Sequence, residues 1–507
     1  MSDPVLPDGF GELRSRLAEL DDLGHAARLL GWDQQTHMPP GGGPARGEAM
    51  ATLERLAHER AVDPGLGTVL ERLAPWAGGR PADDEAAAIV RVARRDHDRA
   101  RRIPVELTAE MARASSEAIG VWVQAKRTSD FGLLQPHLER NVELRRRLAA
   151  CFPEADHPYD ALLDHYEPGM TTAQVRAVFD AMRERLAGLI EAVAARPQPP
   201  PPPGPFPVEA QRRLALEIVR SLGFEEAGWR MDDAEHPFCL GLAPGDIRVT
   251  TRFSQHDLQG VFAALHEAGH GLYEDGVDPG LARTTMGTGV SLGIHESQSR
   301  LWENFVGRSE AFWRHWHPRA LALFGNAALG GSELDGFHRA INAVRPGLIR
   351  VDADEATYAL HILLRFELEV RLVEGGLAVA DLPDAWNEGM RELLGVTVPD
   401  DAHGVLQDIH WAAGELGYFP TYALGTIVAA QLWRAAQAAI PDLDERLARG
   451  EPQALREWLR ERVHRFGRTL DPADVLEQAT GSRLDPAPLL DHLEAKLDAL
   501  YGLSASR

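Results

Sequence analysis

The chain has 507 residues, of which 44% are apolar and 25% charged, a composition typical of a globular protein with a large core. Its 53 basic and 76 acidic residues give a net charge of 53 − 76 = −23, which argues against a nucleic-acid partner because there is no basic field to attract phosphates. The only cysteines, Cys151 and Cys239, exclude a disulfide framework and a thiolate metal site.

The N-terminus, Met1 to Asp8, has neither the basic start nor the apolar stretch of a signal peptide. No run of 18 apolar residues occurs in the chain, so we expect no membrane span and no membrane partner. We therefore expect a cytoplasmic protein.

Most of the chain is expected to be helical, because apolar residues recur with a 3.6-residue period between Gly and Pro breaks. The helices predicted in the first part of the chain cover residues 10–30, 45–62, 84–101, 105–126, 135–151, 171–195 and 208–222. The later ones cover residues 256–273, 292–306, 309–324, 332–344, 354–374, 381–393, 423–438, 442–463 and 486–501.

A proline-rich run at 197–205 cannot be helical and is expected to form an extended surface connection. Helices of the same character continue on both sides, so we expect one domain over 1–507, although this run could also be a domain boundary. Its expected parts are an N-terminal helical part (1–196), a proline-rich loop (197–207), a part that contains the metal motif described below (208–440) and C-terminal helices (441–507).

A short β region is predicted next. Apolar and polar residues alternate over Asp246 to Phe253, Phe238 to Leu242 form a preceding strand, and Ala243-Pro244-Gly245 makes the turn. Such a sheet could offer an extended peptide an edge for backbone pairing. A purely structural hairpin explains the same alternation equally well.

The sequence His266-Glu267-Ala268-Gly269-His270 follows, inside a predicted helix that Ser254-Gln255-His256-Asp257 is expected to cap. Side chains four apart lie on the same helix face, so the two imidazoles can bind one metal ion. Glu267 is turned by roughly a quarter of the circumference, which suits it to act on a water molecule at the metal.

The third ligand must come from elsewhere. Glu274 lies four residues after His270 but has the surroundings of a polar helix end, whereas Glu296 lies among small and apolar residues of the next predicted helix. A buried carboxylate is costly unless it is paired or binds a metal, and a salt bridge to Arg300 is the alternative for Glu296. Two His and one Glu with water in the fourth position are typical of a catalytic zinc site.

Two nearby features complete this region. The outer N–H groups of the metal-binding histidines need acceptors, for which Asp257 and Glu303 are both candidates. The glycine-rich stretch Gly287 to Gly293 lacks the spacing and the lysine of a phosphate-binding loop, so we interpret it as a flexible connection near the metal.

A set of short motifs surrounds this site in a fixed order. They are His236-Pro237-Phe238, Asp246-Ile247-Arg248-Val249-Thr250, the metal motif, His295-Glu296-Ser297-Gln298, Ile349-Arg350-Val351-Asp352-Ala353-Asp354 and Gly404-Val405-Leu406-Gln407-Asp408-Ile409-His410-Trp411. Residues 32–39, 166–171 and 417–422 extend the match over nearly the whole chain. Together they resemble the thermostable-carboxypeptidase (carboxypeptidase Taq) family of zinc metallopeptidases.

The resemblance implies a mostly α, large helical two-lobed fold with a deep active-site groove and a small β region next to the metal helix. It also implies a homodimer that removes single amino acids from peptide C-termini with broad specificity. The implied ligands of one Zn²⁺ ion per chain are His266, His270 and Glu296, and the implied base is Glu267. The same donors suit other divalent ions, so Co²⁺ is an alternative.

Further roles follow from motif position. His410 and Tyr422 are candidates for stabilising the oxyanion, although each could be a buried residue satisfied by backbone groups. Arg248 and Arg350 are candidates for binding the terminal carboxylate of the substrate. Arg350 could instead belong to an ion-pair network with Asp352 and Asp354, and Arg248 could be a surface residue.

Two other functions compete with this interpretation. An endo-acting helical zinc oligopeptidase would use the same metal chemistry, with Arg350 in a structural role. A non-catalytic zinc-bound scaffold that only binds peptides would not need Glu267, whose presence therefore favours an enzyme.

Overall fold

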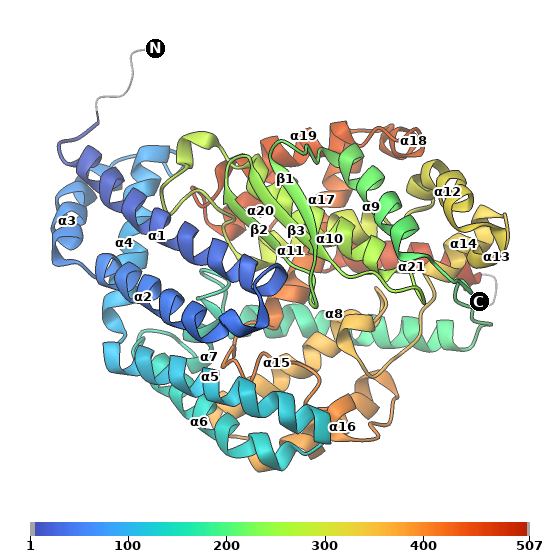
Figure 1. Ribbon diagram of the computed structural model, residues 1–507, viewed down its shortest axis with the longest axis horizontal. Helices are drawn as coiled ribbons and strands as arrows, with labels where there is room; N and C mark the ends of the chain where they lie inside the picture. The colour runs from blue at the N-terminus through green and yellow to red at the C-terminus, as the bar shows by residue number, and fades with distance from the viewer. Residues whose placement is uncertain (1–5, 504–507) are drawn as a thin grey trace.

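Helices form most of the structure, a computed structural model that describes residues 6–503, and so the prediction of a mostly α fold is confirmed (Figure 1). The helices before the sheet are α1 (Phe10–Thr36), α2 (Gly43–Ala61), α3 (Pro64–Gly78), α4 (Glu85–Arg102), α5 (Val105–Thr128), α6 (Phe131–Ala149), α7 (Pro158–Leu163), α8 (Thr172–Ala194) and α9 (Val208–Leu222).

The later helices begin with the pair that carries the metal motif and the candidate third ligand. They are α10 (Gln259–Gly276), α11 (Leu292–Arg300) with a π-helical turn at Leu301–Val306, α12 (Glu310–Phe324), α13 (Asn326–Leu329), α14 (Leu334–Ile341), α15 (Tyr358–Glu374), α16 (Leu382–Leu394), α17 (Pro420–Ala439), α18 (Leu443–Ala448), α19 (Gln453–Arg462), α20 (Pro472–Thr480) and α21 (Ala487–Tyr501).

The predicted helices differ from the observed ones in two ways. Helix α3, which begins where the Asp63 side chain accepts the amides of Gly65 and Leu66, was not predicted, and neither were the short helices α7, α13 and α20. The helix predicted over 442–463 was wrong as one element. It is divided into α18 and α19 because Gly450 adopts a positive φ of 78° between them.

The sheet has three strands in the order β1-β3-β2, with β1 (Trp229–Asp233), β2 (Cys239–Ala243) and β3 (Asp246–Thr251). The predicted hairpin is confirmed, since β2 pairs antiparallel with β3 and Cys239 lies opposite Val249. The parallel partner β1 was missed, and Trp229 lies opposite Ile247 there. Because β3 is the central strand, β2 is an edge of the sheet.

Two hydrophobic clusters hold the structure together. The larger cluster takes buried residues from Leu107 to Tyr501 and includes the apolar faces of α10, α11 and α17. The smaller cluster joins α1, α3 and α4 to Val277, Leu281 and Met286, which follow α10. Figure 1 shows α1–α4 (blue) at one side of the sheet, and the segment after α10 connects these helices to the main body.

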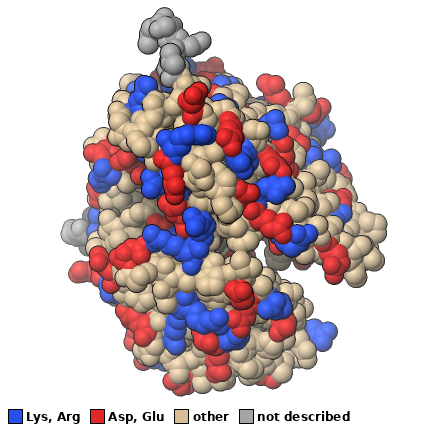
Figure 2. Space-filling view, turned by 90° about the vertical axis from the view of Figure 1, so that its left-hand side faces the viewer, with Lys and Arg blue, Asp and Glu red and all other residues tan. Residues whose placement is uncertain are grey.

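The proline-rich segment lies against the main body. Phe206 at its end is buried, its amide donates to the carbonyl of Gln255, and its ring lies 5.4 Å from that of Phe324. Within residues 6–503, no helix combines the length and hydropathy that a membrane span requires. Acidic and basic side chains are interspersed over the face that Figure 2 shows, which is indented between its upper and lower parts.

Candidate active site

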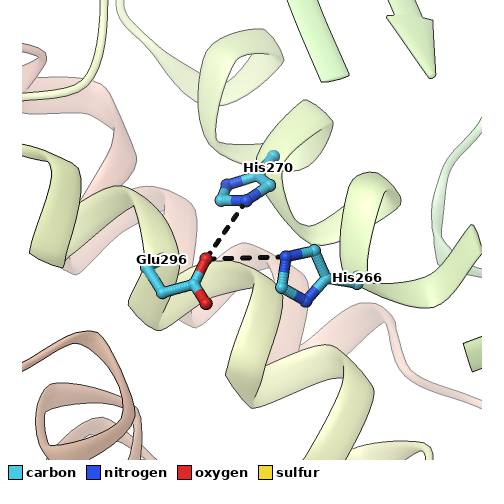
Figure 3. Close-up of side chains that lie close together, drawn as sticks. All are labelled: His266, His270 and Glu296. Atoms are coloured by element: carbon cyan, nitrogen blue, oxygen red, sulfur yellow. Dashed lines mark ion pairs between the residues drawn. The ribbon is translucent and has the colours of Figure 1, made fainter. Parts of the chain in front are cut away.

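The side chains of His266, His270 and Glu296 converge between α10 and α11 (Figure 3). These three residues are called the metal cluster below. Oε2 of Glu296 lies 3.5 Å from Nε2 of His266 and 3.4 Å from Nε2 of His270. One possible ligand atom from each residue lies within 4.8 Å of the others. Two imidazole nitrogens and a carboxylate oxygen in this arrangement suit a divalent metal ion.

Glycines allow the helices of this site to approach closely. A Cβ atom at Gly269 on α10 would lie 2.6 Å from the carbonyl oxygen of Gln298 on α11. A Cβ atom at Gly425 on α17 would lie 2.6 Å from Cβ of Glu296. Any side chain at these positions would push the helices apart, so the glycines set how near Glu296 comes to the two histidines.

Glu296 pairs with Arg300, the alternative that its sequence surroundings offered, and also faces the two histidines. Its Oε1 accepts a hydrogen bond from Nε of Arg300 at 2.7 Å, while its Oε2 faces the histidines and accepts from the hydroxyl of Ser299 at 3.0 Å. Burial alone would raise the pKa of Glu296, but Arg300 and His266 outweigh burial and hold this pKa well below its usual range. The carboxyl is therefore ionised, as a metal ligand must be.

Glu303 is the acceptor for His266. Its Oε2 lies 2.8 Å from Nδ1 of His266, and it also accepts from Nη1 of Arg300 at 3.2 Å. Burial opposes charge on the His266 imidazole, but Glu296 and Glu303 raise its pKa to about 9.

Asp257, the alternative acceptor, lies at the start of α10, where it accepts the amide of Gln259 at 2.9 Å. The predicted cap was also wrong, because the Ser254 hydroxyl accepts the amide of His256 and α10 begins only at Gln259. Ser254 and Asp257 each bond the amide two residues ahead, which forms local turns in place of a cap.

Glu267 is buried on α10 beside the metal cluster. Burial raises its pKa to about 7, and the neighbouring His266 opposes this shift while Glu296 and Glu303 add to it. A carboxyl with a pKa near neutrality can both accept and return a proton. Burial and the charge of Glu267 raise the pKa of the Cys239 thiol on β2.

Glu274, the other candidate for third ligand, does not belong to the cluster. Its Oε1 lies 2.7 Å from Nε2 of His295 and accepts a hydrogen bond from the hydroxyl of Thr288 at 2.9 Å. Helix α10 ends at Gly276, so Glu274 lies at a polar helix end as expected. Its side chain is 11% exposed and is directed at a neighbouring loop and at α11.

His410, Tyr422 and Arg350 form a second cluster. Nε2 of His410 lies 3.1 Å from the Tyr422 hydroxyl, and the Arg350 guanidinium lies 4.8 Å from the centroid of the Tyr422 ring. Tyr358 links this cluster to the metal cluster. Its hydroxyl accepts from Nη1 of Arg350 at 3.2 Å, and its ring lies 4.2 Å beneath the guanidinium of Arg300.

The protonation of this second cluster follows from its burial. Burial lowers the pKa of His410 to about 4, so its imidazole is neutral at pH 7, and its Nδ1 is buried without a hydrogen-bond partner among residues 6–503. Burial holds the pKa of the Tyr422 phenol well above its usual value. Each side chain carries one donor hydrogen at neutral pH, and one of these two hydrogens is engaged in the contact between them.

Within residues 6–503 the ion-pair partner of Arg350 is Asp408, and not Asp352 or Asp354, which the alternative interpretation had offered. Nε and Nη2 of Arg350 donate to Oδ1 of Asp408 at 3.1 and 2.8 Å, while Nε and Nη2 of Arg365 donate to Oδ2 at 2.8 and 2.6 Å. Tyr358, Arg365 and Asp408 were not predicted as residues of the site. Only Asp408 had a visible signal, since it lies in the same motif as His410.

Arg248 lies in a different environment from Arg350. Its Nε and Nη2 donate to Asp246 at 2.9 and 3.0 Å, and its guanidinium lies 4.3 Å from the centroid of the Trp32 ring on α1. The structure thus brings Arg350 together with His410 and Tyr422 but gives Arg248 partners on α1 and β3.

A cavity of about 700 Å³ lies between α1 and the edge strand β2. Glu274 and His295 belong to its wall, so it reaches the residues that contact the metal cluster. The cavity is therefore large enough for several residues of a peptide and borders the edge strand β2.

Comparisons with known proteins agree with these features. The sequence profile of the family described as carboxypeptidase Taq (M32) metallopeptidase matches residues 12–497. The chain is 44% identical to thermostable carboxypeptidase 1 of Thermus thermophilus over 97% of this chain and 98% of that one, and 36% identical to carboxypeptidase 1 of Bacillus subtilis over the same shares.

The fold agrees as well. The crystal structure of the M32 carboxypeptidase from Deinococcus radiodurans superimposes with a TM-score of 0.93 at 39% identity, covering 98% of this chain and 100% of that one. The chain therefore belongs to the carboxypeptidase Taq (M32) metallopeptidase family and is a metal-dependent carboxypeptidase.

Proposed function

We propose that the chain removes single amino acids from peptide C-termini with broad specificity, using one Zn²⁺ ion per chain held by His266, His270 and Glu296. The convergence of these three side chains is the observation that carries the proposal. A metal ion bound there supplies Lewis acidity, which activates water and polarises the scissile carbonyl. Co²⁺ suits the same donors and is the alternative ion.

Glu267 acts as the general base. It accepts a proton from the attacking water and passes it to the leaving amine, a role supported by its burial beside the cluster and its pKa of about 7. His410 and Tyr422 stabilise the oxyanion by donating hydrogen bonds. Their mutual contact, their burial and their neutral forms at pH 7 support this role.

Arg350 binds the terminal carboxylate of the substrate. Of its five N–H groups, Asp408 and Tyr358 engage three within the described part of the chain, which leaves 5 − 3 = 2 for a ligand. Its position beside Tyr422 places it next to a proposed catalytic group. Arg248 is the second candidate, and its stacking on Trp32 favours a contact farther along the peptide.

The peptide chain itself lies along β2. This strand is an edge of the sheet and lines the cavity of about 700 Å³, so its outer backbone groups can pair with an extended substrate. Helix α10, which carries His266 and His270, packs directly against the sheet, since a Cβ atom at Gly271 would lie 2.5 Å from the Trp229 ring.

A mass-spectrometric time course on N-terminally blocked peptides tests the proposal. We expect a ladder of products, each shorter by one C-terminal residue, and no products after treatment with a chelator. Peptides with amidated C-termini are the control, because an endo-acting oligopeptidase would cut them as fast as the free acids, whereas the proposed exopeptidase would cut them much more slowly. Internal cleavage as the first event would contradict the exopeptidase proposal, and the absence of any product would favour a peptide-binding scaffold.

We also propose a homodimer and a cytoplasmic location, and we treat the chain as a single domain in the four parts given above. The main hydrophobic cluster supports a single domain, because it takes residues from before and after the proline-rich loop. Light scattering combined with gel filtration tests the dimer, for which the expected mass is twice 55.6 kDa.

A further inference from the structure

The two candidate metal-binding histidines are supported in different ways. Nδ1 of His266 lies directly against the carboxylate of Glu303. Nδ1 of His270 instead lies 2.6 Å from Nδ1 of a third histidine, His295, whose Nε2 lies 2.7 Å from Oε1 of Glu274. We propose that His295 and Glu274 form a hydrogen-bonded relay that positions His270 for the metal, an inference that rests on the proposed metal site.

The geometry assigns one direction to each hydrogen bond. A metal ion bound by His270 would take up the Nε2 lone pair, so the ring proton would lie on Nδ1 and be donated to His295. Nδ1 of His295 must accept this hydrogen bond and is therefore unprotonated. The proton of the neutral His295 ring then lies on Nε2. From there it is donated to Glu274. Only this arrangement satisfies both short contacts with neutral rings.

The surroundings of Glu274, the last residue of the relay, favour its ionised form. Its Oε1 also accepts the hydroxyl of Thr288 at 2.9 Å and the amide of Gly289 at 3.3 Å. These donors stabilise a negative charge but could not stabilise a neutral acid in the same way. The relay therefore transmits the electrostatic effect of the Glu274 carboxylate to His270 through the His295 imidazole. His266, in contrast, contacts the Glu303 carboxylate directly.

Two glycines enclose the relay. A Cβ atom at Gly289 would lie 2.7 Å from Cδ2 of His295, and a Cβ atom at Gly241 on β2 would lie 2.7 Å from Cβ of Glu274. The glycine-rich stretch that we expected to be a flexible connection thus packs against His295 and donates to Glu274. These contacts hold one side of each relay side chain, while the other side borders the cavity described above.

The affinity for Zn²⁺, measured by competition with a chromophoric chelator, tests the relay without reference to catalysis. Removing a partner of this kind typically weakens metal binding by about 10–100-fold, which is the loss expected for His295→Phe. His295→Asn should restore part of the affinity, because its amide oxygen can accept from Nδ1 of His270. Glu274→Gln should cause a smaller loss than His295→Phe, since it keeps an acceptor and removes only the charge.

The matched control is Tyr273→Phe. Tyr273 lies next to Glu274 on α10 and its hydroxyl accepts the amide of Val290, so this variant removes a buried hydroxyl beside the relay but keeps the ring that contacts His295. We expect its affinity to equal that of the parent. Gly289→Ala removes no polar group but displaces His295, so it should weaken binding even if His295→Phe fails to fold.

The outcomes separate this inference from the metal site on which it rests. His270→Ala should abolish tight binding, and unchanged affinity in that variant would refute the metal site. If His270→Ala loses the metal while His295→Phe, or Gly289→Ala in its place, binds as tightly as the parent, the relay is refuted and the metal site stands. A loss in Tyr273→Phe as large as in His295→Phe would also refute the relay, because it would show general loosening.

Discussion

Arg350→Ala should impair the cleavage of peptides with a free C-terminal carboxylate far more than that of the same peptides with an amidated end. Within residues 6–503 two N–H groups of Arg350 have no hydrogen-bond partner, and a charge-assisted pair that they would form with a carboxylate contributes about 1.5–3 kcal/mol. That range corresponds to a loss of about one to two decades in kcat/KM for the free-carboxylate substrate. Arg350→Lys should restore only part of it, because an ammonium lacks the planar fork.

Arg365 provides a matched control for the loss of the ion pair. Both arginines bind Asp408, but the Arg365 side chain is fully buried and cannot reach a substrate. Arg365→Gln should therefore lower the melting temperature and reduce activity on both substrates to the same extent. In Arg350→Ala the Asp408 carboxylate keeps its two bonds from Arg365, so the fold should survive.

The assay compares kcat/KM for an N-blocked dipeptide and for its amide in each variant, together with the melting temperature. Equal losses on the two substrates in Arg350→Ala would refute the reasoning. The same selective loss in Arg365→Gln would also refute it, because the effect would then come from the ion-pair network and not from contact with the substrate.

Two further predictions concern the metal cluster. Glu267→Gln should keep the metal but lose about 10²–10⁴-fold in kcat, since the proposed ligands are other residues; metal analysis beside turnover checks this, and activity close to the parent would place the base elsewhere. Affinity for Zn²⁺ should rise with pH by about tenfold per unit between pH 7 and 9 and level off above pH 9. The pKa of His266 in the metal-free protein is raised to about 9, so below that pH the metal must displace a proton from His266 in order to bind. A calorimetric titration in buffers of different ionisation enthalpy counts that proton, and an affinity independent of pH would contradict the assignment. Since the pKa of His266 is raised in the folded metal-free state, the stability it contributes is present below pH 6.5 and is lost as the pH rises through about 9.

The sequence predicted those features that depend on spacing along one element. His266 and His270 share a face because helix geometry alone places residues four apart together. The hairpin of β2 and β3 was predictable because its strands are adjacent and alternate. The strand β1 was not, because its partner β3 follows only after β2 and the pairing is parallel.

Contacts between distant segments could not be predicted in this way. Arg350 and Asp408 are 58 residues apart, and the nearer Asp352 and Asp354 offered a plausible but wrong pairing. Glu303 and Asp257 were equal candidates in the sequence, and only the packing of α11 and its π-helical turn against α10 separates them. The close packing of Gly289 against His295 could not be predicted. A glycine has no side chain whose polarity or spacing indicates which residue packs against it.

The close approach of α17 to Glu296 has a consequence for biosynthesis. Gly425 is made 425 − 296 = 129 residues after Glu296, an interval of about 6–26 s at the usual rates of translation. Throughout that interval the nascent chain carries all three candidate ligands but lacks the helix that closes the site around Glu296. The packing around Glu296 is therefore completed only after the ribosome has passed α17, and a chain truncated before residue 420 would retain every candidate ligand yet lack the helix that packs against Glu296.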